Sequence, residues 1–249
     1  TMLHGEGIKP GELPEDWNVS HPEVIQKIHK AYFDAGSNVI NTNTFGANSL
    51  KFSRERLREV VSAAFDNANA ARAASVGKQP KYIALDIGPT GRLLKPYGDF
   101  DFEDAVECFA ETVRLGVEFG AELIFIETMN DSYETKAALL AAKENSGLPV
   151  FVSNAYGEDG KLMTGASPSA MVAMLEGMGA DAVGANCSLG PKQLMGVVRE
   201  LVSAASVPVL VKPNAGLPCN DGEHTFYDVN DEEFSESIAE MARLGANIL

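Results

Sequence analysis

ADAVGANCSLGPKQLMGVVRELVSAA, residues 180–205, joins a short apolar run, a glycine-proline turn and a segment of helical periodicity. The strand is expected over Ala180 to Gly184 and the helix from Gln193 to Ala205. Cys187 therefore falls at the carboxyl end of a β-strand, which is where barrels of alternating strands and helices place catalytic groups. The alternative is a structural thiol packed under the rim of the barrel.

The same strand and helix unit repeats along the chain. Each apolar run is followed by a turn and then by a segment of 3.6-residue periodicity, and short continuous apolar strands covered by amphipathic helices imply a parallel sheet. The runs are Asn38 to Ile40, Tyr82 to Leu85, Leu123 to Ile126, Pro149 to Val152, Ala180 to Gly184 and Val207 to Val211.

The strand entrances alternate between two kinds. Glycine precedes one set, at Gly36, Gly120, Gly179 and Gly245, and proline the other, at Pro80, Pro149 and Pro208. Both chain ends, Thr1 to Leu3 and Ala246 to Leu249, look like interrupted elements. Counting them gives eight strands, so we expect one (β/α)8 TIM barrel domain over residues 1–249, with strands 1 and 8 truncated. A doubly wound sheet is the alternative, but the chain has no G-x-G-x-x-G after its first strand.

Three helices carry start and stop residues. Ser20 and Glu23 fit a capping box, and Gly36 follows that helix. Ser167 with Pro168 predicts another helix start, and Asn230 or Asp231 can cap the last helix. The expected apolar face of the first helix is Val24, Ile25, Ile28, Ala31 and Tyr32.

Composition places the chain among ordinary globular proteins. It has 249 residues, of which 45% are hydrophobic and 22% charged. No apolar run approaches 18 residues and the acidic first twenty residues do not resemble a signal peptide, so we expect a cytoplasmic protein that does not bind a membrane. The net charge of −15 argues against nucleic acid as a partner.

Polar residues follow the predicted strands, and a barrel would bring them to one mouth. They are Asn41 to Thr44, Asp86, Glu127 with Thr128, Asn154, Asn186 with Cys187, and Lys212 to Asn214. Glu127 directly follows a buried strand, so its carboxylate needs a cationic partner, such as a substrate ammonium, or a bound proton. Asp86 can equally cap its loop, and any single Asn or Thr can simply mark where the chain surfaces.

The remaining cysteines and histidines suggest no second site. Cys108 lies in a helical stretch and is expected to be a buried small hydrophobe, while Cys219 lies in a long loop. The four histidines, His4, His21, His29 and His224, have no metal-binding spacing.

Five segments resemble the homocysteine S-methyltransferase family. They are Asn41 to Asn48 (NTNTFGAN), Ile87 to Gly91 (IGPTG), Glu127 to Met129 (ETM), Gly184 to Cys187 (GANC) and Lys212 to Pro218 (KPNAGLP). The resemblance runs the whole length of the chain and is strongest to the amino-terminal, homocysteine-binding domain of cobalamin-dependent methionine synthases.

The resemblance implies a zinc site of three cysteines with the substrate thiol as fourth ligand. Cys187 matches the first cysteine, and the other two are expected in a Gly-Gly-Cys-Cys-Gly motif beyond Leu249. Glu127 resembles the family residue that receives the substrate's α-ammonium, and the backbone at Ser188 can hold the α-carboxylate. Further substrate-binding candidates are Asn186, Asn154, Thr44 and Asp86.

The implied function is a methyltransferase that uses zinc and cobalamin. Homocysteine thiolate, activated on zinc, accepts a methyl group from methylcobalamin carried on another domain, and a methyltetrahydrofolate-binding domain is a further expected partner. Alternatives are a homocysteine S-methyltransferase that uses S-methylmethionine or betaine, and a non-catalytic amino-acid-binding module. A phosphate-handling barrel is disfavoured, because the loop Asn214 to Pro218 has no paired-glycine cradle.

Overall fold

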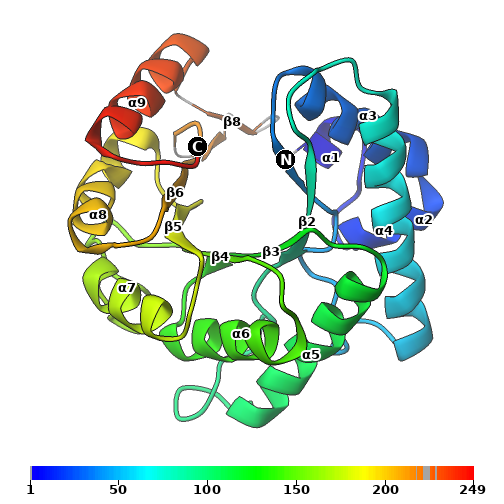
Figure 1. The fold of residues 1–249 in the computed structure, drawn as a ribbon, viewed down its shortest axis with the longest axis horizontal. Helices are drawn as coiled ribbons and strands as arrows, with labels where there is room; N and C mark the ends of the chain where they lie inside the picture. Colours follow the sequence, from blue (N-terminus) through cyan, green and yellow to red (C-terminus); the bar gives the residue numbers. More distant parts are fainter. Residues whose placement is uncertain (1, 217, 221–224, 228) are drawn as a thin grey trace. The chain divides into compact units, whose positions relative to one another are not determined.

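The computed structural model describes residues 2–216, 218–220, 225–227 and 229–249. The chain divides into two compact units. One unit comprises Thr1–Phe125 and Leu140–Pro149, and the other comprises Ile126–Leu139 and Val150–Leu249. Figure 1 labels the elements of both units.

Six parallel strands follow one another in the sheet in the same order as in the chain. They are β1 (Val39–Asn41), β2 (Tyr82–Ile87), β3 (Leu123–Met129), β4 (Val150–Asn154), β5 (Ala182–Asn186) and β6 (Val209–Lys212). Each overlaps one of the six predicted apolar runs, which confirms that a strand lies there; β5, for example, begins two residues later than its predicted run. A strand order that never reverses is that of a (β/α) barrel, whereas a doubly wound sheet has a switch point.

The first unit opens with helices. These are α1 (Met2–Gly5), the 3-10 helix η1 (Pro14–Asp16), α2 (Trp17–Ser20), α3 (Pro22–Asp34), α4 (Arg54–Ala74) and α5 (Phe102–Glu118). The prediction of a partial strand at the amino-terminal end was wrong, because Met2–Gly5 is helical. Leu3 from this helix packs against a buried cluster of Ile8, Trp17 and Ile25.

Both the first residue of helix α3 and its buried face differ from the prediction. Ser20 ends α2 and its hydroxyl donates to the Asp16 carbonyl at 3.1 Å, so it forms no capping box; Pro22 opens α3 instead. The buried face is Ile25, His29 and Phe33, while Tyr32 is exposed. A stripe with four-residue spacing therefore packs against α4, and it includes a histidine that the apolar pattern omitted. Gly36, at φ 107°, follows the helix as expected.

In the second unit, helices cover the strands. Helix α6 (Ser132–Asn145) begins in this unit, and α7 (Pro168–Gly177), α8 (Pro191–Ala204) and α9 (Asp231–Leu244) follow it in the chain. Helix α8 packs on β5 and β6 and lies between α7 and α9 (Figure 1). The predicted caps are confirmed: Ser167 accepts from the Ala170 N–H, and Asn230 accepts from the Glu233 N–H.

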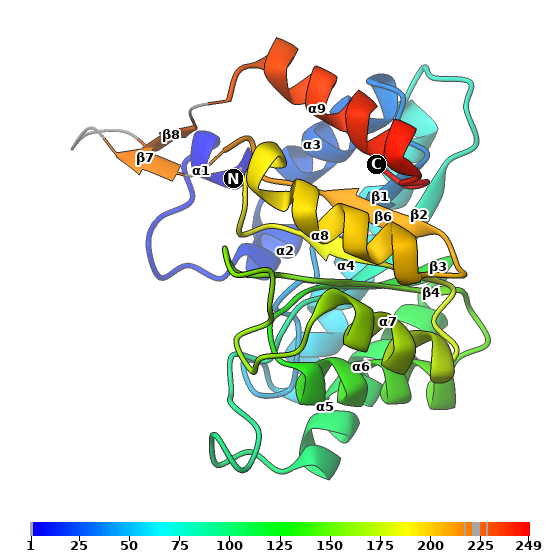
Figure 2. The same ribbon diagram turned by 90° about the vertical axis from the view of Figure 1, so that its left-hand side faces the viewer.

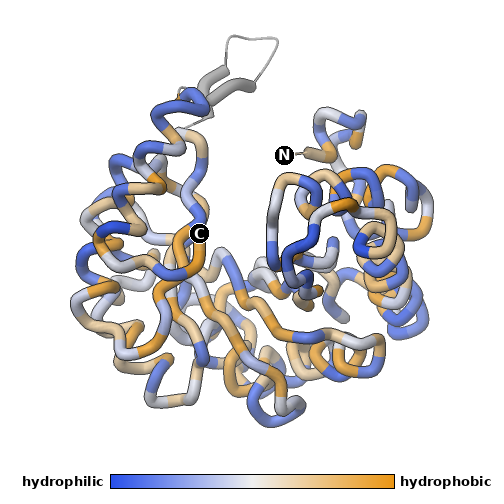
Figure 3. Tube along the Cα trace, turned by 45° about the horizontal axis from the view of Figure 1, so that its top comes forward, coloured by the Kyte–Doolittle hydropathy of each residue, from blue (hydrophilic) through white to orange (hydrophobic). Residues whose placement is uncertain are grey.

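The core of this unit requires a glycine in β5. All five residues of β5 are buried, and a Cβ at Gly184 would meet the Leu210 carbonyl oxygen at 1.9 Å. The strands are apolar, whereas the helices that cover them carry hydrophilic turns (Figure 3). Within the described ranges, no helix combines the length and apolar character that crossing a membrane requires.

Two features follow β6. Strands β7 (Pro218–Asn220) and β8 (Thr225–Tyr227) form an antiparallel pair (Figure 2), so Cys219 lies in a strand and not in the expected loop. Leu217 and His224 lie outside the described residues. After α9, Ile248 forms a parallel bridge with Leu210, as predicted for the start of a further strand.

Candidate active site

The second unit gathers polar side chains at the carboxyl ends of its strands. Glu127 and Thr128 stand near the end of β3, Asn186 ends β5 and is followed by Cys187, and Lys212 ends β6. Parallel strands bring their carboxyl ends to the same edge of the sheet, so these predicted residues share one edge.

Glu127 has a cationic partner within the chain. Lys212 Nζ lies 2.7 Å from Glu127 Oε2, and the two side chains are 43% and 14% exposed. The prediction that this carboxylate needs a positive charge is met by Lys212 in the structure. The second carboxylate oxygen, Oε1, accepts no hydrogen bond from the described part of the chain and remains available to a ligand.

Asn186 forms three hydrogen bonds to protein groups through its side-chain amide. Its Oδ1 accepts from the Thr128 N–H at 2.8 Å and from the Ser153 hydroxyl at 2.6 Å, and its Nδ2 donates to Thr128 Oγ1 at 2.7 Å. The residue is buried. Its amide therefore ties the ends of β3, β4 and β5 together, next to the Cys187 thiol.

Residues at the end of β3 and just after the end of β5 have unusual backbone conformations. Thr128 and Cys187 both have φ of 61°, and Ser188 has φ of 52°. Non-glycine residues in this region cost about 1–2 kcal/mol each and cluster at functional sites. The Ser188 hydroxyl stabilises the turn by donating to the Tyr156 carbonyl at 2.6 Å.

The turn after β5 leaves backbone donors unused. The Cys187 N–H donates to the Lys212 carbonyl at 3.0 Å, but those of Ser188 and Gly190 find no acceptor among the residues described. They precede α8, whose first residue is Pro191. The amino-terminal end of a helix favours anions, so this turn can receive a carboxylate.

The side-chain amide of Asn154, at the end of β4, donates hydrogen bonds to other residues of the protein. It is fully buried, and its Nδ2 donates to the Met129 carbonyl at 3.1 Å and to Thr135 Oγ1 at 3.0 Å. Its Oδ1 accepts no hydrogen bond from the described residues. The geometry places this predicted substrate residue between β3 and the first turn of α6.

Thr44 and Asp86 belong to the first unit, where they lie together. The Thr44 hydroxyl donates to the Asp86 carbonyl at 2.8 Å, and Asn41 Nδ2 donates to Asp86 Oδ1 at 3.3 Å. Nearby in the same loop, the Gly46 N–H donates to the buried Glu15 carboxylate at 2.6 Å. Sequence reasoning missed Glu15, which precedes the first predicted strand and follows no strand itself.

The thiols differ in their surroundings. Cys108 is buried in α5, as predicted, and desolvation raises its thiol pKa. Cys187 is a half-buried free thiol. Within the described ranges, no three His, Cys, Asp or Glu side chains come together as metal ligands, so these residues alone do not form the expected zinc site.

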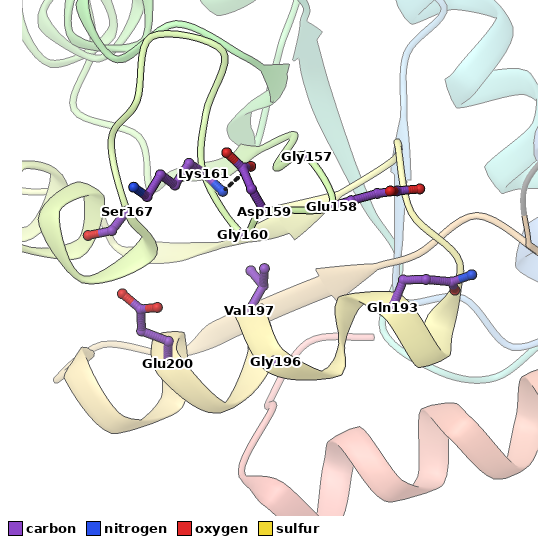
Figure 4. Close-up of a pocket in the computed structure, with 10 residues that line it drawn as sticks. All are labelled: Gly157, Glu158, Asp159, Gly160, Lys161, Ser167, Gln193, Gly196, Val197 and Glu200. Atoms are coloured by element: carbon purple, nitrogen blue, oxygen red, sulfur yellow. Dashed lines mark hydrogen bonds between the residues drawn. The ribbon is translucent and has the colours of Figure 1, made fainter.

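A separate hollow of about 380 Å³ lies between α8 and the turn after β4. Residues 157–161 and Ser167 line one side, and Gln193, Gly196, Val197 and Glu200 line the other (Figure 4). Lys161 N–H donates to Asp159 Oδ1 in this turn. None of the strand-end residues lines the hollow, so it is distinct from the candidate site.

Tyr156 and Ser153 support the site and were not predicted. Tyr156 is fully buried, and its hydroxyl has no hydrogen-bond partner in the described part of the chain. Desolvation, with a smaller contribution from the Glu200 charge, raises the pKa of Tyr156, which keeps the phenol neutral. Both residues look like ordinary strand-end residues in the sequence, and only tertiary contacts reveal their roles.

Sequential parallel strands with a thiol and a carboxylate at their carboxyl ends define a barrel-type α/β enzyme fold. The homocysteine S-methyltransferase family model matches residues 2–249, and the chain belongs to this family.

Relatives agree with this assignment. The chain is 29% identical over 232 residues to a methionine synthase of Mycobacterium leprae and 30% identical over 234 residues to that of Mycobacterium tuberculosis. Each alignment covers 89% of this chain and 19% of the relative, so the chain spans about a fifth of their length. The metallated homocysteine methyltransferase MmuM of Escherichia coli has the same fold, with TM-score 0.82, 18% identity, and coverage of 99% of this chain and 86% of that chain.

Proposed function

We propose that residues 1–249 act as a homocysteine-binding domain that presents the substrate sulfur for methylation to methionine. The observation that carries the proposal is the strand-end edge where Glu127, on β3, and the Cys187–Ser188 turn, after β5, are linked through the hydrogen bond from the Thr128 N–H to Asn186 Oδ1. Glu127 binds the α-ammonium of homocysteine through its carboxylate, and the N–H groups of Ser188 and Gly190 bind the α-carboxylate.

The remaining candidates act on the site through the backbone. Asn186 holds the turn that carries Cys187, and Asn154 fixes the ends of β3 and α6. Thr44 and Asp86, in the first unit, are kept as substrate-binding candidates on the family resemblance alone. Asn186 and Asn154 are thus proposed as positioning residues, since the Asn186 amide bonds to Thr128 and Ser153 and the Asn154 amide donates to Met129 and Thr135.

Cys187 is proposed as a zinc ligand, together with two thiolates from outside the described residues. Zinc deprotonates a thiol that it coordinates, and the thiolate is the nucleophilic form of homocysteine. A half-buried free thiol fits this role, whereas buried Cys108 does not. In the methyl transfer the S–CH3 bond would form as the bond between the methyl group and its donor breaks, with that electron pair staying on the donor and the thiol proton released to solvent beforehand.

The proposed methyl donor is methylcobalamin on another domain, with a methyltetrahydrofolate-binding domain as a further partner. Support comes from the methionine synthases, which are about five times longer than the segment they share with this chain. The second candidate is a homocysteine S-methyltransferase that uses a soluble donor such as S-methylmethionine or betaine.

The test uses the full-length protein with one methyl donor at a time. Methionine formed only with methylcobalamin supports the proposal, and methionine formed with a soluble donor supports the second candidate. Zinc well below one equivalent, together with no homocysteine binding, contradicts both and indicates a non-catalytic module.

Variants test the two main residues. Cys187→Ala is expected to lose zinc and activity, with Cys108→Ala as the control that keeps both. Activity lost with zinc unchanged would contradict the ligand role. Glu127→Gln is expected to weaken homocysteine binding by about 10- to 100-fold, the usual effect of removing a charged hydrogen-bond partner.

A further inference from the structure

The ion pair between Lys212 and Glu127 spans the candidate site. Glu127 comes from β3 and Lys212 from β6, and β4 and β5 lie between them in the sheet. Their contact of 2.7 Å therefore passes over the carboxyl ends of two intervening strands. One of these strands is β5, which leads directly to Cys187.

Lys212 also adjoins the turn that is expected to hold an anion. Its carbonyl accepts the Cys187 N–H at 3.0 Å, and residues Asn186 and Lys212 are paired in the β5–β6 ladder. The next N–H along the chain, that of Ser188, has no acceptor among the residues described. A single lysine thus touches the carboxylate of Glu127 with its side chain and the Ser188 turn with its main chain.

An α-amino acid carries the complementary charges on one carbon atom. Its ammonium matches Glu127, whose Oε1 is open, and its carboxylate matches Lys212 together with the Ser188 N–H. An unpaired charge is costly in a partly desolvated site. Before binding, Glu127 and Lys212 pair with each other. After binding, Glu127 pairs with the ligand ammonium and Lys212 with the ligand carboxylate, so each of these charges has a partner in both states.

We propose that Glu127 and Lys212 form a zwitterion clamp, defined as this residue pair, which is closed on itself when empty and opens to bind both charges of an α-amino acid. The proposal rests on the proposed function and deepens it, since it assigns recognition of the substrate carboxylate to Lys212. Selectivity follows, because a thiol that lacks either charge leaves one residue of the clamp unsatisfied.

Calorimetric titration of the full-length protein with four ligands tests the clamp. L-homocysteine carries all three groups, 3-aminopropane-1-thiol lacks the carboxylate, 4-mercaptobutanoate lacks the ammonium, and L-2-aminobutanoate lacks the thiol. Wild-type protein is expected to bind homocysteine more tightly than either thiol that lacks a charge.

Lys212→Met is expected to weaken homocysteine binding by about 10- to 100-fold while leaving 3-aminopropane-1-thiol binding undiminished. Lys212→Arg keeps the charge and is expected to retain most of the preference. Lys192→Met removes an exposed lysine that pairs with Glu233 on the surface, and it is expected to change nothing. Thermal unfolding of each variant verifies that it is folded.

Three results would overturn the clamp. Tighter homocysteine binding by Lys212→Met would show that the lysine only competes for Glu127, and an equal loss for homocysteine and 3-aminopropane-1-thiol would show a purely structural role. If 2-aminobutanoate binding depends on Lys212 but homocysteine is never methylated, the clamp stands and the proposed function fails. If homocysteine is methylated and its binding does not depend on Lys212, the proposed function stands and the clamp fails.

Discussion

Thr128 and Asn186, 58 positions apart in the chain, are joined by two hydrogen bonds that use both ends of the Asn186 amide. Thr128 and the residue after Asn186, Cys187, both have φ of 61°. The amide thus links two strand ends that depart from extended geometry at the same level. This one side chain therefore positions both the backbone next to Glu127 and the backbone next to Cys187.

Replacing Asn186 with alanine is expected to lower the free energy of unfolding by about 2–4 kcal/mol. Three hydrogen bonds disappear, and the partly buried Thr128 N–H loses its acceptor. Urea denaturation measures the change. Asn69→Ala, on an exposed position of α4, is the control and should change stability by less than about 0.5 kcal/mol. A loss no larger than that of the control would show that the amide is not a brace.

The backbone strain at Cys187 predicts that glycine is more stabilising than alanine at this position, the reverse of the order in a helix. Cys187→Gly is expected to be more stable than Cys187→Ala by about 1 kcal/mol, because alanine keeps the Cβ that disfavours φ of 61°. The same pair at Cys108, inside α5, is expected to give the opposite order by about 1 kcal/mol. Alanine being preferred at both positions in urea denaturation would argue against strain at Cys187.

Gly184 and Gly196 form a matched pair of glycine sites. A Cβ at Gly184 would lie 1.9 Å from the Leu210 carbonyl oxygen, whereas one at Gly196 would meet nothing within 4 Å. Gly184→Ala is therefore expected to cost more than about 3 kcal/mol, since the β5–β6 ladder must separate. Gly196→Ala, in helix α8, is expected to stabilise by about 0.5–1 kcal/mol. The difference in urea midpoint between the two variants measures both effects.

His29 predicts a dependence of stability on pH. Burial lowers its pKa from 6.5 to about 4, because desolvation disfavours the charged imidazolium. Between these values the unfolded chain binds a proton that the folded chain does not, so stability is lost as pH falls from about 6.5 to 4. The loss is on the order of 3 kcal/mol.

His29→Leu should remove that part of the pH dependence in unfolding titrations between pH 4 and 7. His21→Gln, which replaces an exposed histidine just before the same helix, serves as the control for the loss of a histidine as such. An unchanged profile in His29→Leu would mean that the imidazole is not buried in its neutral form.

Local pattern sufficed for the framework. The strands were predictable because each is a continuous apolar run bounded by glycine or proline, and such runs are typical of strands that are buried on both faces. Caps at Ser167 and Asn230 were predictable because their partners lie three residues away. The face of α3 was not, since a stripe containing His29 depends on packing against α4.

The sequence by itself determined the order of strands and helices, the family, and which polar residues end each strand, because these depend on neighbours in the chain. Only the tertiary structure decided their partners: Lys212 lies against Glu127 from 85 positions away, and Asn186 bonds to Thr128 from 58 positions away. Contacts between distant segments are set by the register of the strands and by side-chain packing, and no local periodicity encodes them.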